Sequence, residues 1–70
     1  MKIKKYGFYV NPEDFTQVSN ELEMRGIDYD IWNAEEVFLG TAKQVEFNVA
    51  TQEDADTMKE ILSSISNIYS

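Results

Sequence analysis

The residue types that perform most enzyme chemistry are missing from this chain or stand without partners. It has no histidine to transfer protons near neutral pH and no cysteine to act as a nucleophile. Paired carboxylates can do acid–base work when one of them is desolvated in a cleft, but a chain of 70 residues has little room for one. No base accompanies the serine hydroxyls, which lie at Ser19, Ser63, Ser64, Ser66 and Ser70. We therefore expect a protein that is not an enzyme.

Two acid-rich stretches are the candidates for metal ligands. They are Asp28-x-Asp30 and Glu53-Asp54-x-Asp56. Neither has the run of oxygen ligands around a glycine, closed by a glutamate, that a calcium loop needs. Zinc is disfavoured because its usual ligands are cysteine and histidine. The three glycines are scattered, so no phosphate-binding loop is expected. The sequence predicts neither a metal nor a cofactor.

Aromatic and acidic side chains share one face of the predicted strands, and this pattern favours a binding surface. Tryptophan and tyrosine are frequent hot spots of protein interfaces. We predict partner-binding residues, with the two glutamates of residues 35–36 at the rim, as follows: Tyr9, Asp28, Asp30, Trp32, Glu35, Glu36 and Glu46. The alternative is that Trp32 lies beneath residues 33–36 as part of the core, since tryptophan is highly buried on average.

The charge of the chain indicates which partners such a surface would accept. Thirteen acidic residues face six basic ones, for a formal net charge of −7. Three of the bases are Lys2, Lys4 and Lys5, so from Tyr6 onward thirteen acids face three bases, a net of −10. Such a surface repels nucleic acid and anionic membranes and attracts basic protein surfaces. The same charge would also arise if it served only to keep a small protein in solution.

In size and charge, though in no motif, the chain resembles small acidic phage proteins that imitate DNA and block host nucleases. The resemblance implies an inhibitor or regulator that docks an acidic surface on a basic, nucleic-acid-binding partner. The lack of cysteine suits a reducing compartment. Because neither a signal-peptide apolar region nor a membrane-spanning run is present, we expect a cytoplasmic protein.

The first half of the chain reads as strand, helix, strand. Alternation in residues 3–10 predicts the first strand. Asn11 is a suitable N-cap and Pro12 suits the first helical position, while Gly26 is a suitable left-handed end for the helix. Alternation resumes in residues 27–32 and predicts a second strand.

The second half reads as strand and helix. Residues 33–36 break the alternation as a bulge or a short turn, and Val37-Phe38-Leu39 is expected to resume an extended chain. After a turn at Gly40, residues 45–49 alternate as another strand. Thr51 then begins a helix through a capping-box pattern. Its expected buried stripe is Ala55, Met58, Leu62 and Ile65, with Ile61 and Ile68 beside it. The tail, residues 67–70, either ends this helix or forms a short strand.

These elements predict a single α+β domain over residues 1–70, with a small ferredoxin-like (β-α-β-β-α) arrangement. Its antiparallel three-stranded sheet would carry two helices on one face and lack a full fourth strand. The first strand would lie beside the last one, and its other edge would be open. The lysines of the first five residues could blunt this edge, or it could pair with a partner strand or with a second copy as a homodimer.

Two other roles fit the same fold. The chain could be a small-molecule-sensing domain that dimerises through its sheet and binds ligands at the dimer interface, by analogy with other ferredoxin-like domains. It could also be an assembly subunit whose open edge completes a larger structure.

Overall fold

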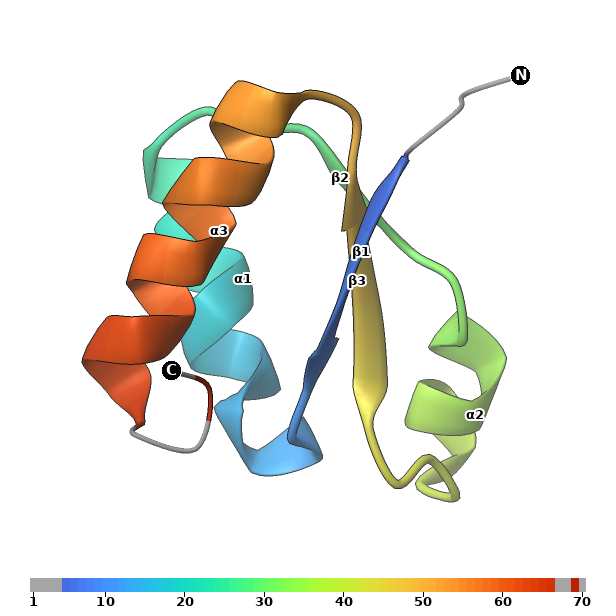
Figure 1. Ribbon diagram of the computed structural model, residues 1–70. Helices are drawn as coiled ribbons and strands as arrows, with labels where there is room; N and C mark the ends of the chain where they lie inside the picture. Colours follow the sequence, from blue (N-terminus) through green and yellow to red (C-terminus); the bar gives the residue numbers. More distant parts are fainter. Residues whose placement is uncertain (1–4, 67–68, 70) are drawn as a thin grey trace.

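Three strands form one antiparallel sheet, and two long helices cover one side of it (Figure 1). The structure is a computed structural model that describes residues 5–66 and residue 69. Its elements in chain order are β1 (Tyr6–Val10), a 3-10 turn η1 (Pro12–Asp14), α1 (Phe15–Met24), β2 (Tyr29–Ile31), α2 (Ala34–Leu39), β3 (Val45–Val49) and α3 (Gln52–Ile65).

Strand β3 lies in the centre of the sheet, between β1 and β2. Both of its neighbours run antiparallel to it, with Phe8 and Ile31 opposite Phe47. The predicted small α+β domain with an antiparallel three-stranded sheet is therefore confirmed, as is the predicted position of the first strand beside the last one. Strand β1 lies at an edge of the sheet.

The prediction of an extended chain over residues 37–39 is wrong, because this run belongs to the short helix α2. Three consecutive apolar residues fit a buried strand and one turn of helix equally well. Two acids in the first turn, Glu35 and Glu36, favour the positive end of a helix dipole. Gly40 then ends the helix in the left-handed conformation, with φ 76°. The element order is consequently β-α-β-α-β-α instead of the expected β-α-β-β-α.

The ends of the two long helices follow their sequence signals with one exception. Thr51 caps α3 as predicted, because its hydroxyl accepts a hydrogen bond from the backbone N–H of Asp54 (3.1 Å). Gly26 follows α1 with φ 70°, and Ile27 N–H folds back onto the Leu22 carbonyl (3.0 Å). Asn11, however, makes no side-chain capping bond, and the 3-10 turn η1 separates it from α1.

The hydrophobic core lies between the sheet and the pair α1 and α3. Phe47 is fully buried at its centre, with its ring 5.7 Å from that of Phe15 and 5.5 Å from that of Tyr29. Such tilted ring pairs add to the stabilisation from burial itself. The buried cluster contains residues from β1, β3 and both long helices: Val10, Val18, Leu22, Val45, Phe47, Met58, Ile61 and Leu62.

Tyr69 fastens the end of the chain to the start of the first helical segment. Its hydroxyl donates a hydrogen bond to the Asp14 carboxylate (2.8 Å) and accepts one from the backbone N–H of Asn11 (2.8 Å). Desolvation by burial, followed by the bond to Asp14, raises the pKa of Tyr69 above its ordinary value. The expectation for the rest of the tail lies outside the described residues.

We predict that Tyr69→Phe lowers the free energy of unfolding by about 1 kcal/mol at neutral pH, because two hydrogen bonds are lost. The pKa of Tyr69 in the folded state is raised above the ordinary value of about 10. The contribution of Tyr69 to stability is therefore complete below about pH 10, and it is lost as the pH rises through the folded-state pKa. Urea unfolding between neutral and strongly alkaline pH measures both effects.

The difference in the free energy of unfolding between the wild type and Tyr69→Phe should become smaller at alkaline pH. The Tyr69→Phe variant should itself still lose some stability at alkaline pH, because desolvation by burial also raises the pKa of Tyr29. Tyr9→Phe is the control, since this side chain is 59% exposed. A gap between wild type and variant that stays constant up to high pH would contradict the assigned role of the hydroxyl.

Candidate functional site

The side of the sheet that faces away from α1 and α3 carries the predicted aromatic and acidic residues. Because Val45, Phe47 and Val49 point into the core, the alternation of strand β3 turns Glu46 and Asn48 the other way. We call this surface the open sheet face and define it as Gly7, Tyr9, Asp30, Trp32, Glu46 and Asn48.

Tyr9, Glu46 and Trp32 form one row across the three strands. Tyr9 on β1 lies opposite Glu46 on β3. On the other side, the backbone N–H of Trp32 donates to the Glu46 carbonyl (3.1 Å), which extends the pairing one residue beyond β2. Tyr9 is 59% exposed and Trp32 is 60% exposed. The alternative in which Trp32 is part of the core is therefore wrong.

The predicted carboxylates lie on or beside this row, at different depths. Glu46 is half-buried between the two aromatic residues, and Asp30 is half-buried in the next row, opposite Asn48. Asp28 is exposed and lies one residue before β2. Glu35 and Glu36 are exposed in the first turn of α2, and α2 projects from the side of the sheet opposite to α1 and α3 (Figure 1). The fold thus places Tyr9, Asp30, Trp32 and Glu46 on one face of the sheet, and the helix that carries Glu35 and Glu36 lies on the same side.

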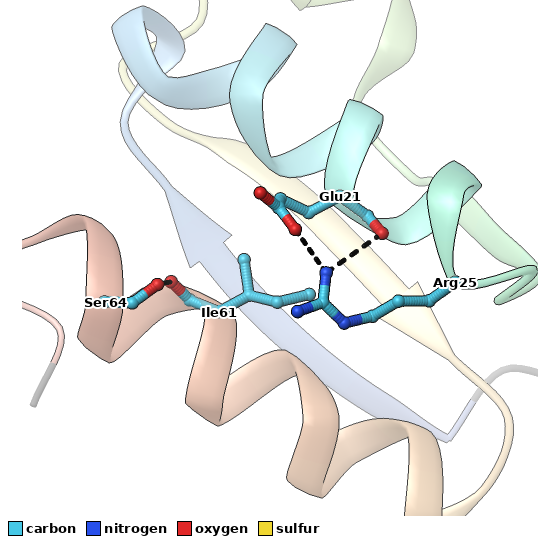
Figure 2. A network of polar contacts seen from close by, with 4 residues as sticks. All are labelled: Glu21, Arg25, Ile61 and Ser64. Atoms are coloured by element: carbon cyan, nitrogen blue, oxygen red, sulfur yellow. Dashed lines mark hydrogen bonds and ion pairs between the residues drawn. The ribbon is translucent and has the colours of Figure 1, made fainter.

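Basic side chains are outnumbered in this region. Lys5, just before β1, and Lys43, in the connection from α2 to β3, are exposed. Among the described residues on or beside the open sheet face, these two lysines are outnumbered by five carboxylates, at residues 28, 30, 35, 36 and 46. Arg25 lies on the helical side, where its guanidinium pairs with the Glu21 carboxylate and also donates to the Glu21 carbonyl (3.3 Å; Figure 2). The open sheet face and its surroundings are therefore acidic.

Asn48 is a buried polar residue at the centre of this face, which sequence reasoning did not single out. It is only 2% exposed, and its amide donates to the Glu46 carboxylate (3.4 Å). Gly7 lies opposite it, and a Cβ atom at position 7 would approach the Asn48 Oδ1 atom to 2.8 Å. The glycine therefore leaves the space that the amide fills. An isolated glycine inside a strand signals such a close approach, so this pair could have been found.

Asn33 holds the start of α2 against strand β3. Its side-chain amide donates to the Gln44 carbonyl (2.6 Å), and its Oδ1 atom accepts from the Glu46 N–H (2.9 Å). At the other end of α2, the N–H groups of Thr41 and Ala42 both donate to the Glu36 carbonyl (3.0 and 3.2 Å). Both ends of this short helix are thus fixed by hydrogen bonds.

Phe38 and Leu39 are large apolar side chains that α2 exposes to solvent, which the sequence analysis did not predict. Phe38 is 89% exposed and Leu39 is 63% exposed, whereas the preceding Val37 packs against the core. Neighbouring residues of a helix point in different directions, so only one of the three turns inward. Sequence reasoning missed this pair because it took residues 37–39 as extended.

No pocket opens among the described residues, and no three acidic side chains among them lie close enough to hold a metal ion. No helix in the described part of the chain is long and apolar enough to cross a membrane. What these residues offer is a surface of exposed aromatic rings and carboxylates.

We predict that Gly7→Ala destabilises the fold by about 1 kcal/mol, because the new methyl group displaces the buried Asn48 amide. Asn48→Ala removes the obstacle, so the double variant should be more stable than the sum of the two single effects. A double-mutant cycle from urea unfolding measures this coupling. Strictly additive effects would contradict the close contact between residues 7 and 48.

We predict that Asn33→Ala costs about 1–3 kcal/mol and loosens α2, because the Glu46 N–H and the Gln44 carbonyl lose their partner. Hydrogen exchange should show faster exchange for the amides of residues 37–42 and little change in α3. Asn20→Ala, at an exposed position on α1, is the control. Unchanged exchange in residues 37–42 would show that Asn33 does not hold the helix.

Comparisons of the chain with protein-family models, with curated proteins and with solved structures give no significant match. Function is therefore inferred from geometry and charge.

Proposed function

We propose that this protein is a non-catalytic binding module that inhibits or regulates a partner by docking its open sheet face on a basic protein surface. The observation that supports this most is the row of Tyr9, Glu46 and Trp32, in which two large aromatic side chains are each about 60% exposed on either side of a carboxylate. Tryptophan and tyrosine supply much of the binding energy at protein interfaces when they become buried there.

Electrostatics selects the class of partner. The described residues on or beside the open sheet face include five carboxylates and two lysines, and the whole chain has a net charge of −7, so phosphate backbones are repelled and basic grooves are attracted. A groove built for nucleic acid has the matching charge. A phage-encoded inhibitor that imitates DNA and occupies a host nuclease in the cytoplasm is one form of this proposal, and it agrees with the small size of the chain.

A second candidate role rests on the position of β1 at the edge of the sheet. The strand order β1-β3-β2, with α1 and α3 on one side, resembles a ferredoxin-like domain without its fourth strand, and α2 is then an insertion between β2 and β3. In such a domain the edge of β1 would accept a strand from a second copy or a partner. A sensing or assembly subunit would use this edge and not the aromatic row.

We predict that partner binding weakens steeply with salt and depends on the open sheet face. The immobilised protein is incubated with lysate of the organism that carries it, or of its host, at about 0.05 M and about 0.5 M salt, which screen exposed charges weakly and strongly. Proteins retained are identified by mass spectrometry. The binding variant combines Trp32→Ala, Asp28→Asn and Asp30→Asn, and it should lose the salt-sensitive partner.

The charge-matched control is Glu13→Gln with Glu60→Gln, which also removes two negative charges, but from exposed positions outside the open sheet face. This control should retain the partner. A folded triple variant that keeps every partner would exclude the open sheet face as the binding surface. Binding that is insensitive to salt would exclude a mainly electrostatic attraction.

A further inference from the structure

Helix α2 presents two apolar side chains to water in a fixed orientation. Phe38 and Leu39 are 89% and 63% exposed, while Val37 packs inward and fixes the rotation of the helix. The Asn33 side chain and the bonds to the Glu36 carbonyl hold its two ends. A rigid apolar projection of this kind loses little conformational entropy when it binds, so its burial contributes efficiently to affinity.

The position of α2 links this projection to the open sheet face. The helix begins two residues after Trp32 and lies on the side of the sheet away from α1 and α3 (Figure 1). Its first turn carries Glu35 and Glu36, both exposed, just before the apolar pair. An apolar centre with acidic neighbours has the composition of an interface core with a polar rim.

We propose that Phe38 and Leu39 are the apolar anchors of the interface, and that they contact an apolar surface of the partner rimmed by lysine and arginine side chains that meet Glu35 and Glu36. This inference rests on the proposed function and specifies the chemistry of the partner. The basic groove of the partner then has an apolar surface at one end, which contacts Phe38 and Leu39, in addition to the lysine and arginine side chains that face Asp30 and Glu46.

Charge complementarity decides between a basic partner and a second copy of this chain. Two copies that met through α2 would bring Glu35 and Glu36 of each close together, and each chain has a net charge of −7. Like charges brought together at an interface cost several kcal/mol. A basic partner gains from the same carboxylates, so it is the occupant that we propose.

The test uses two synthetic peptides of equal charge as probes. One contains only leucine and lysine and forms an amphipathic helix, which mimics an apolar surface rimmed by cations. The other has serine in place of leucine. Titration of the isotope-labelled protein, followed by NMR, gives the affinities. We expect the leucine–lysine peptide to bind at least about tenfold more tightly and to shift the amide signals of residues 37–39, since burying apolar side chains supplies the difference.

Phe38→Ala combined with Leu39→Ala should weaken binding of the leucine–lysine peptide at least about tenfold. Both side chains are exposed, so the variant should keep the fold, which thermal unfolding monitored by circular dichroism checks. Met24→Ala is the matched control: Met24 is 76% exposed but lies on α1, on the other side of the sheet, and its loss should leave the affinity within about twofold.

A further variant, Asp30→Asn with Glu46→Gln, separates this inference from the proposed function. If it weakens binding while the Phe38/Leu39 variant binds like the wild type, the open sheet face binds cations and α2 is not the anchor. If it has no effect on either peptide, the proposed function fails. A wild-type dimer in sedimentation experiments that dissociates in the Phe38/Leu39 variant would overturn the basic partner in favour of a second copy.

Discussion

The structure depends on strand β3 lying in the centre of the sheet with two different faces. On one face, Phe47 is sealed between the rings of Phe15 and Tyr29. On the other, Glu46 and Asn48 are turned away from the core, although Asn48 is still only 2% exposed. Since side chains alternate along a strand, burial of Phe47 fixes the orientation of Glu46 as well. The same strand register therefore fixes both the packing of the core and the arrangement of the open sheet face.

The side of the sheet away from α1 and α3 is only partly covered, with the short helix α2 lying on that side, and it carries both buried polar and exposed aromatic side chains. Gly7 makes room for the Asn48 amide, while Tyr9 and Trp32 remain exposed beside Glu46. Tyr9 and Trp32 are each about 60% exposed, so most of their surface adds no packing energy to the folded chain and is free to be buried by a partner. Their position on an acidic surface is what favours a role in binding.

Much of this arrangement could be read from the sequence, because alternation and capping are local signals. Thr51 and Gly26 marked helix ends correctly, and the side-chain alternation placed Tyr9, Trp32 and Glu46 on a common face. The failure at residues 37–39 has a physical cause: a run of three apolar residues has no period, so tertiary contacts decide its conformation. Here the Asn33 side chain bonds to the Gln44 carbonyl and the Glu46 N–H and holds the start of α2, and contacts at this sequence separation have no local signature.

Helix α2 is attached to the rest of the molecule mainly through Asn33, Val37 and the turn after Gly40. Lengthening a surface connection changes the entropy of closing it only slowly, by about 0.6 kcal/mol for each doubling of its length. The β2–β3 connection can therefore accept a longer loop at low entropic cost, provided that the Asn33 bonds and the contact of Val37 with the core are kept. If α2 is the recognition segment that we propose, engineered versions of the chain can be given new specificities by changing the exposed residues of α2 while Val37 is kept.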